Sequence, residues 1–394
     1  MKIAIVIERI EAWRGGAETS TMELSRLLTQ RGHEVHVITS TNTPSPPDMT
    51  IHRIPAATMI RPLRTSVFVQ RASEFLRRNQ FDVVHAVSPV ACADVYQPRG
   101  GLLAETMERN VATRPTATRR AMKRALMRLN FKQRQLLELE QRVFRKGGPL
   151  ILAVSQYVAR QCDAYYNLSS PRVRVVFNGV NGQPVSDDER AAGRAAVRKQ
   201  HHVSDDTLLL LFIAHNFRLK GMFPLIETLS RLVVSGFTSF RLLVAGRDNP
   251  VRYQRRLDAL GLTRFVTFTG PTQRVTSFYH AADVCVHPTY YDPCSRVVLE
   301  ALWHGVPCIT TSFNGAAEVM HDGLEGFVID TPGNIGLWAR RIQELQSAEL
   351  RCKMSKKALL LRDKIGMPRH VAELDTLFAE LAERKRASRM ASDE

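Results

Sequence analysis

The sequence predicts an α/β protein with two domains, each organised on a parallel sheet. Buried strand patterns alternate with amphipathic helix patterns from Lys2 onward, which is typical of βαβ units. A polar, glycine-rich segment, Phe177–Gly182, interrupts the alternation, which then resumes. At 394 residues the chain is long enough for two separate cores. We therefore expect a first domain at 1–177, a linker at 178–183 and a second domain at 184–367.

The first domain begins with a strand–helix–strand unit. Lys2–Glu8 and Glu34–Thr39 have the apolar pattern of buried strands, and Ala17–Gln30 has that of a helix between them. Gly15 and Gly16 therefore lie at the carboxyl edge of a parallel sheet, beside a helix N-terminus. Backbone can approach a phosphate or a sugar closely there, although turn formation alone also explains two adjacent glycines.

Three later segments are expected to complete the first sheet. Phe81–His85, Pro149–Val154 and Val173–Val176 are short apolar runs of strand length. The first of them leads into a loop that contains Asp94 and Tyr96.

A basic segment lies between these strands, at 114–146. It holds eleven Lys or Arg against two acids, a net charge of +9 within a chain whose formal charge is +17. Apolar residues are interleaved at nearly helical spacing, which favours a basic amphipathic helix at an anionic membrane surface. A solvated helix that packs its leucines on the sheet is the alternative, and the two can hold together. Nucleic acid is not expected as a partner, since Phe131 and Phe144 are the segment's only aromatic residues. The candidate membrane residues are Arg119, Arg120, Lys123 and Arg124.

The second domain repeats the alternation. Strand Leu208–Ala214 leads into a loop that contains Arg218 and Lys220, and two cations at the end of a first strand suit a diphosphate. A later strand ends at Gly246 and Arg247, which we expect to line the same pocket.

The stretch from 283 to 315 carries the strongest pattern. A strand at Val284–His287 is followed by an aromatic, polar loop and a helix for which Ser295 is the predicted N-cap. The first helical amides could bind an anion, while Asp292 and Glu300 could accept hydrogen bonds from a ribose or hexose. This is the chemistry of a nucleotide-sugar site. An ordinary strand–loop–helix unit with solvated acids is the alternative.

This stretch resembles the signature of the family 4 retaining glycosyltransferases. The matching residues are Asp292-Pro293-Cys294-Ser295-Arg296-Val297-Val298-Leu299-Glu300-Ala301 and Gly305-Val306-Pro307. Lys220-Gly221, Gly15-Gly16-Ala17-Glu18 and Asn178-Gly179-Val180 match further family motifs. Aspartate stands at 292, where the family has glutamate. The surroundings of Asp94 and the basic segment look most like the lipopolysaccharide core glucosyltransferases.

The resemblance implies a GT-B fold, with two Rossmann-like domains facing each other across a cleft. It also implies a closing helix, 368–388, that packs toward the first domain, and it assigns roles to the motif residues. The catalytic residues would be Lys220, Arg218 and Asp292; the donor-binding residues Gly15, Gly16, Gly246, Arg247, Cys294, Ser295, Arg296, Val297 and Glu300; the acceptor-binding residues Asp94, Tyr96 and Arg99.

The resemblance further implies transfer of a hexose, glucose being favoured, from a nucleotide diphosphate sugar with retention of configuration. A UDP-sugar would be the donor substrate, a glycan or glycolipid the acceptor, and no cofactor is expected. No Asp-x-Asp occurs, so no metal site is predicted. The first residues read as a strand and not as a signal peptide, which predicts a cytoplasmic protein. Together with the basic segment, this predicts a location peripheral to the inner membrane. A GT-B nucleotide-sugar epimerase and a non-catalytic protein that binds anionic surfaces are the alternatives.

Overall fold

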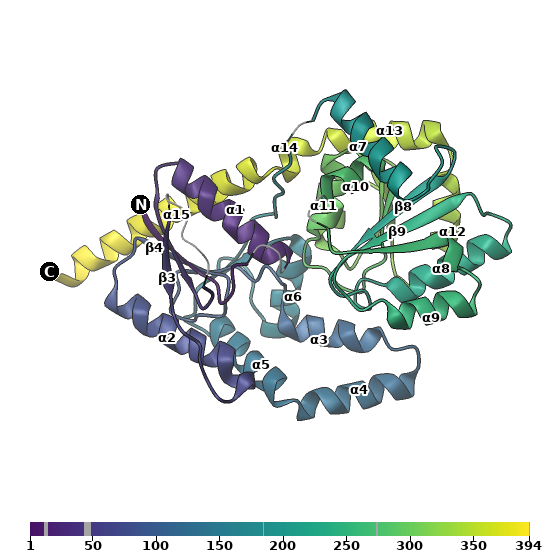
Figure 1. Cartoon of the computed structure of the whole chain (residues 1–394). Coiled ribbons are helices and arrows are strands. Elements are labelled where there is room, and N and C mark those ends of the chain that lie inside the picture. The colour runs from purple at the N-terminus through teal and green to yellow at the C-terminus, as the bar shows by residue number, and fades with distance from the viewer. Residues whose placement is uncertain (12–14, 43–48, 184, 273–274, 394) are drawn as a thin grey trace. The chain divides into compact units, whose positions relative to one another are not determined.

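The computed structural model describes residues 1–11, 15–42, 49–183, 185–272 and 275–393. The chain divides into unit 1, Met1–Asn181 with Met367–Glu394, and unit 2, Gly182–Gly366. The division thus falls within the predicted linker, while the predicted start of the second domain, residue 184, lies outside the described residues. Each unit is a parallel sheet covered by helices on both faces (Figure 1).

Unit 1 is built on a seven-stranded parallel sheet of order β3-β2-β1-β4-β5-β6-β7. The strand order reverses direction between β1 and β4, which pair in parallel. Its elements are β1 (Lys2–Val6), α1 (Gly16–Gln30), β2 (Glu34–Thr39), β3 (Thr50–Arg53), η2 (Arg61–Leu63), α2 (Arg64–Arg78), β4 (Val83–Ala86), β5 (Val95–Tyr96), α3 (Leu103–Ala112), α4 (Ala117–Leu129), α5 (Phe131–Phe144), β6 (Leu150–Ala153), α6 (Gln156–Tyr166), β7 (Val173–Val175) and α15 (Met367–Asp393).

The core of unit 1 joins the two ends of the chain. Ile3 and Ile5 of β1 are fully buried against Leu24 of α1 and against Leu374 and Phe378 of α15. Helix α15 therefore covers the sheet beside α1, and α2 and α5 lie on the other face (Figure 1). Because its apolar side chains complete this core, α15 is a structural part of unit 1.

Unit 2 is built on a six-stranded parallel sheet of order β10-β9-β8-β11-β12-β13. Its strand order reverses between β8 and β11. Its elements are α7 (Asp187–Gln200), β8 (Leu208–Ile213), α8 (Met222–Val234), β9 (Phe240–Ala245), α9 (Val251–Ala259), η3 (Thr263–Phe265), β10 (Val266–Gly270), α10 (Val275–Ala281), β11 (Val284–His287), α11 (Arg296–Trp303), β12 (Cys308–Thr311), η4 (Gly315–Val319), β13 (Gly326–Ile329), α12 (Ile335–Glu344), α13 (Ala348–Leu359) and α14 (Arg362–Ile365).

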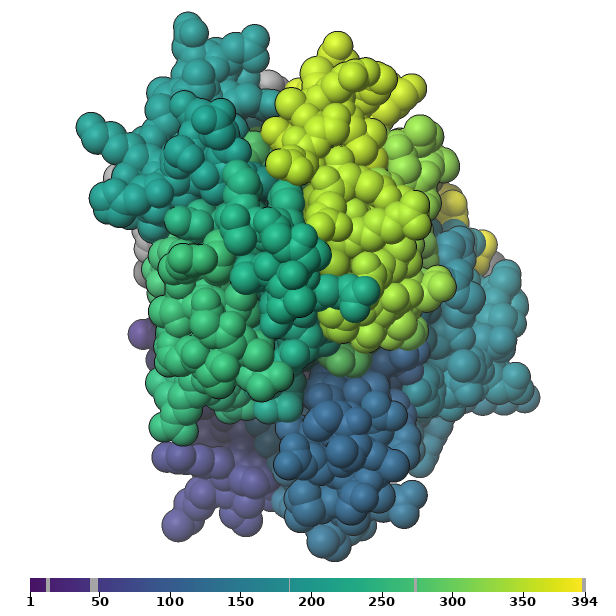
Figure 2. Space-filling view, turned by 90° about the vertical axis from the view of Figure 1, so that its right-hand side faces the viewer, coloured from purple at the N-terminus to yellow at the C-terminus, as the bar shows by residue number. Residues whose placement is uncertain are grey.

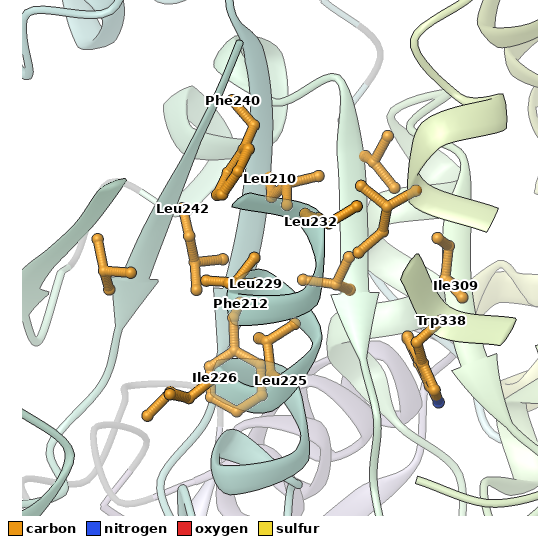
Figure 3. Close-up of a cluster of buried hydrophobic side chains, with 14 of the residues drawn as sticks. Leu210, Phe212, Leu225, Ile226, Leu229, Leu232, Phe240, Leu242, Ile309 and Trp338 are labelled. Atoms are coloured by element: carbon orange, nitrogen blue, oxygen red, sulfur yellow. The ribbon is translucent and has the colours of Figure 1, made fainter. Parts of the chain in front are cut away.

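The core of unit 2 lies between the sheet and helices α8 and α12. Leu210 and Phe212 of β8 meet Leu225 and Leu229 of α8, and Trp338 of α12 closes one end (Figure 3). These side chains are at most 1% exposed. Burial of each stabilises the unit by about 1.5–3 kcal/mol. This packing holds the ends of β8 and β11 in a fixed relation, which positions the loops that follow them.

The basic segment departs from the predicted single helix. It forms two helices, α4 and α5, because Asn130 ends α4 and caps α5 by accepting a hydrogen bond from the backbone amide of Gln133 at 3.1 Å. The leucines of α4 do not pack on the sheet as the alternative supposed, since Leu126 and Leu129 are 57% and 81% exposed. The packing alternative is therefore wrong for α4.

The end of the chain also differs from the prediction. The basic composition of residues 384–389 predicts a disordered tail, but α15 continues through this segment to Asp393. Lys385 forms an ion pair with Asp94 at 2.8 Å and Arg386 one with Asp82 at 3.2 Å. These contacts tie the last turns of the helix to the sheet. Among the described residues, no helix combines the length and the apolar character needed to cross a membrane.

Candidate active site

Two loops of unit 2 meet where its strand order reverses. One follows β8 and contains Lys220, and the other follows β11 and contains Asp292. Crevices at the carboxyl ends of strands, at such a reversal, are the usual ligand sites of parallel α/β sheets. The fold therefore brings together two motifs that lie 72 residues apart in the chain.

An ion pair joins the two loops. The ammonium group of Lys220 donates to the carboxylate of Asp292 at 2.7 Å and to the carbonyl oxygen of Tyr291 at 2.8 Å. Gly221 permits this approach: its φ of +85° is accessible to glycine, and a Cβ there would collide with the carbonyl oxygen of Pro288. The glycine at 221 is therefore required by the geometry at this edge of the sheet.

Asp292 is held ionised. Burial opposes its ionisation, but the charge of Lys220 and the imidazole of His287 outweigh this effect and keep the pKa of Asp292 well below its ordinary value. The His287 Nε2 atom lies 3.4 Å from the carboxylate, and burial lowers the pKa of His287 itself. The site thus presents one cation and one carboxylate, each at least four-fifths buried.

The N-terminus of α11 is fixed from two sides. The Ser295 hydroxyl accepts a hydrogen bond from the backbone amide of Val298 at 3.4 Å, which confirms Ser295 as the N-cap. The backbone amide of Ser295 donates to Asn314 Oδ1 at 3.1 Å, and the same oxygen accepts from the amide of Ala316. Asn314 is 1% exposed. The first turn of the helix, with Arg296 and Val297, is thereby oriented before any ligand binds.

Glu300 lies one turn into α11 and is held by two donors. The Tyr279 hydroxyl donates to one carboxylate oxygen at 3.0 Å, and Arg296 donates to the other at 3.1 Å. The Glu300 side chain is 27% exposed, so it is not fully enclosed by the protein. Burial and the Glu300 charge raise the pKa of Tyr279 well above its ordinary value, so the phenol remains a donor.

The edge of β9 borders the same loop. Gly246 has a φ of +147°, and a Cβ there would collide with the carbonyl oxygen of Ala214. Desolvation lowers the pKa of His215, and the charges of Arg247 and Lys220 lower it further. Both cations therefore act on one imidazole, while a role for Gly246 and Arg247 in the nucleotide pocket stays a prediction.

Arg218 and Cys294, two further predicted site residues, have different surroundings. The Arg218 guanidinium lies over the Phe223 ring at 5.0 Å from the centroid, on the first turn of α8. Cys294 is 6% exposed and precedes the N-cap of α11. Packing thus explains the small side chain at 294, whereas Arg218 is partly exposed.

The predicted residues of unit 1 are spread over several elements. Gly15 is the N-cap of α1 and Gly16 its first residue. The Asp94 carboxylate accepts from the amide of Val84 at 2.7 Å and pairs with Lys385. These contacts stabilise the connection between β4 and β5.

Tyr96 and Arg99 are interior side chains. Tyr96 is 5% exposed in β5 and packs edge-on against Phe144. Arg99 is 8% exposed and donates to the Ser20 hydroxyl of α1. Their burial assigns both a structural role in unit 1, and contact with an acceptor stays a prediction for them as for Asp94.

Unit 1 also contains a polar hollow of about 410 Å³ between α2, α5 and the β4–β5 connection. Ser73 and Arg77 of α2 and Arg142 of α5 are among its lining residues. None of the predicted donor residues lines this hollow. It is a second place where a ligand could fit.

Three residues of the unit 2 site were not anticipated. His287, Tyr279 and Asn314 each contact a predicted residue: Asp292, Glu300 and Ser295, respectively. His287 ends the strand that precedes the loop, so its position was a usable signal. Tyr279 and Asn314 reach the site only through tertiary packing.

Each unit has a parallel sheet, and in unit 2 a cation and a carboxylate lie where the strand order reverses. Two such sheets in one chain define the class of GT-B proteins. The chain matches two family models. One, described as "Glycosyltransferase Family 4", covers residues 14–183, and the other, "Glycosyl transferases group 1", covers residues 193–360. The chain therefore belongs to the family 4 glycosyltransferases.

Individual relatives agree with this assignment. The lipopolysaccharide glucosyltransferase WaaG of Escherichia coli K12 is 24% identical over 321 residues, 81% of this chain and 82% of WaaG. A crystal structure of WaaG superposes with a TM-score of 0.80 at 21% identity, covering 95% of this chain and 99% of that one. Anabaena Alr3699/HepE in complex with UDP-glucose gives a TM-score of 0.70 at 17% identity, covering 98% and 100%. At these low identities, the similarity to the two solved structures shows that the fold is shared.

Proposed function

We propose that the protein is a retaining hexosyltransferase that moves glucose from UDP-glucose to a glycan or lipopolysaccharide-core-like acceptor at the cytoplasmic membrane face. The observation that carries the proposal is the pair of Lys220 and Asp292 beside the N-terminus of α11, one turn from Glu300. The similarity to WaaG and the UDP-glucose complex of a structural neighbour support the choice of donor and acceptor.

In this mechanism the leaving diphosphate carries the charge that must be stabilised. The sugar's C1–oxygen bond to the diphosphate breaks, and a bond from C1 to the acceptor oxygen forms. The acceptor proton passes to the departing phosphate oxygen. Lys220 and Arg218, with the α11 amides of Arg296 and Val297, would supply fixed positive potential to that oxygen. No side chain need act as a nucleophile.

The carboxylates would position the donor. Glu300, with Tyr279 and Arg296 already bound, would accept hydrogen bonds from the ribose hydroxyls. Asp292 would accept from a hydroxyl of the transferred sugar, where the family's longer glutamate does so. Gly246 and Arg247 would line the nucleotide side of the pocket. Donor binding by Gly15 and Gly16 stays a prediction.

Product analysis tests the reaction. Incubation with a panel of nucleotide sugars and a lipopolysaccharide-core acceptor fragment, followed by mass spectrometry, should show one added hexose with UDP-glucose. NMR of the product should show the anomeric configuration of the donor. An altered sugar formed without acceptor would instead indicate an epimerase. Absence of turnover with every donor, despite binding to anionic surfaces, would support a non-catalytic binding protein.

The reaction is expected to be independent of metal. A divalent ion would need a set of oxygen ligands, and among the described residues no group of three His, Cys, Asp or Glu side chains is placed to hold one. Lys220 and the helix amides would take over the ion's electrostatic role. Transfer should therefore persist in excess EDTA. Complete loss that Mg²⁺ restores would contradict the proposed role of these groups.

Attachment to the membrane is proposed to occur through α4. Met122, Leu126 and Leu129 recur on one face of this helix and are 59%, 57% and 81% exposed. The helix carries five cations and no acid: Arg119, Arg120, Lys123, Arg124 and Arg128. Exposed apolar side chains among cations are the features of a helix at an anionic bilayer surface.

The fixed ends of the neighbouring helices support this role. The Glu140 carboxylate of α5 accepts hydrogen bonds from the first amides of α3, Leu103 at 2.5 Å and Ala104 at 3.2 Å. Tyr166 donates to Glu140 at 2.5 Å. Helix α4 is thus presented between two anchored helices while most of its own side chains stay exposed.

Replacing Arg119, Arg120, Lys123 and Arg124 with Gln should release the protein from vesicles that contain anionic lipid. Each cation near such a surface contributes about 1 kcal/mol, and salt screens it over about 8 Å at physiological strength. Co-sedimentation should therefore fall steeply with salt for the parent. The matched control replaces Lys199, Lys353, Lys356 and Lys357 of unit 2. Equal binding by the α4 variant and the parent would contradict the proposal, and transfer to a soluble acceptor should be unchanged.

A further inference from the structure

A second exposed apolar element lies in unit 1, immediately before η2. Met59 is fully exposed and Ile60 is 55% exposed. The turn has a defined backbone: the amide of Ile60 donates to the Thr58 hydroxyl at 3.2 Å, and the amide of Leu63 donates to the Ile60 carbonyl at 2.9 Å. Water therefore surrounds two large apolar side chains on an ordered turn, at a substantial hydration cost.

The charged residues that flank this turn in the chain are all cations, and the nearest carboxylate that the contacts show is Glu8, which accepts from the Thr65 hydroxyl at 2.7 Å. Arg61 and Arg64 follow the apolar pair directly, and Arg53 precedes it. The sequence from 49 to 73 contains no aspartate or glutamate. The turn thus has the same composition as α4, which is apolar residues among cations with no acid. A surface with anionic groups on the outside and an apolar layer beneath them would complement the cations and the apolar side chains of this turn.

The fold places the turn next to the α4–α5 corner. Helix η2, which continues the turn, packs against α5. Helix α5 begins at Phe131, which is 50% exposed and only two residues after Leu129 of α4. In Figure 1 the start of α2 and helix α4 lie along the same lower edge of unit 1. Figure 2 shows the same lower edge after a turn about the vertical axis, with the blue surface of α4 at the bottom.

We infer that the 58–61 turn is a second membrane-insertion element, which acts together with α4 and Phe131 on one anionic bilayer. This inference rests on the proposed attachment through α4 and goes beyond it. Two separated insertion points hold unit 1 at a defined tilt on the bilayer, whereas a single helix would leave it free to rotate. They also strengthen binding, because the second contact forms at high effective concentration once the first is made.

The test is the double variant Met59→Ser/Ile60→Ser in co-sedimentation with vesicles of phosphatidylglycerol and phosphatidylcholine. Partitioning should fall by about tenfold or more, because two apolar side chains no longer enter the interface. The matched control is Val234→Ser/Leu360→Ser in unit 2, whose side chains are 85% and 72% exposed. It should bind as the parent does. All four side chains are on the surface, so both variants should fold.

A spectroscopic readout separates insertion from mere proximity. Tryptophan introduced as Met59→Trp should shift its emission to the blue on anionic vesicles and be quenched by brominated lipid. Unchanged partitioning of the double variant with no quenching, while the α4 variant is released, would overturn the inference and leave attachment through α4 intact. If the α4 variant also stays bound, both the inference and the proposed attachment fail.

Discussion

Lys220→Ala is expected to lower the rate of sugar transfer by a hundredfold or more. The ammonium group is the cation that the structure fixes nearest to Asp292, and it would stabilise the diphosphate as charge develops on it. Loss of one such preorganised contact costs about 3 kcal/mol in the transition state. Initial rates with UDP-glucose at saturating acceptor measure this effect.

Stability must be measured beside the rate, because the substitution also leaves Asp292 without its partner. Removal of one member of a buried ion pair destabilises a protein by about 3–5 kcal/mol. The double variant Lys220→Ala/Asp292→Asn removes the uncompensated charge and should regain thermal stability but not activity. Lys353→Ala, which breaks a surface pair with Glu349 in the same unit, should change neither. A folded Lys220→Ala protein that turns over at the parent rate would remove Lys220 from the site.

Glu300→Ala is expected to weaken donor binding by tenfold to a hundredfold and to lower kcat/KM by at least as much. The carboxylate would be the acceptor for two ribose hydroxyls, and hydrogen bonds to a charged group contribute about 1.5–3 kcal/mol. Titration of UDP by calorimetry reads this contribution without the need for an acceptor. Glu300→Gln should lose less, because it keeps one acceptor oxygen.

Glu344→Ala is a matched control for this variant. Glu344 is 30% exposed, close to the 27% of Glu300, and it is also bound by arginines of its own helix, Arg340 and Arg341. It lies on α12, away from the predicted donor residues in the sequence. Parent-like UDP affinity in Glu300→Ala, or an equal loss in Glu344→Ala, would show that Glu300 is not the ribose contact.

The fold and the centre of the site could be predicted because local patterns determine them. Helix α11 begins where Ser295 predicts, since a serine N-cap acts through its own neighbouring amides. The strand–helix alternation also places Lys220 and Asp292 at the ends of β8 and β11. Because β8 and β11 are parallel strands of one sheet, their carboxyl ends lie at the same edge of that sheet.

What could not be predicted depends on contacts between distant residues. Tyr279 reaches Glu300 from another helix, and nothing near either residue indicates that hydrogen bond. The tail after 384 has the composition of a disordered segment. It is nevertheless helical, and Lys385 in this tail forms an ion pair with Asp94, 291 residues away in the chain. The carboxylate in this ion pair belongs to Asp94, which the sequence assigned to acceptor binding.

In the basic segment the sequence pattern predicted an apolar helix face but did not decide what covers that face. Leu126 and Leu129 have helical spacing, which indicates an apolar face but not what covers that face. In the structure this face is exposed, and only Met127 of the helix is buried. The exposed turn at Met59 had no pattern at all in the sequence.

Hydrogen–deuterium exchange with and without UDP tests the central claim most directly, since it locates the nucleotide on the parent protein. The account predicts protection of peptides that contain the Lys220 loop and the Asp292–Glu300 segment, and loss of this protection in Glu300→Ala. Peptides of α2 and α5 that line the polar hollow at Arg77 and Arg142 should exchange as before. Protection confined to that hollow, with the two loops of unit 2 unchanged, would contradict the assignment of the donor site.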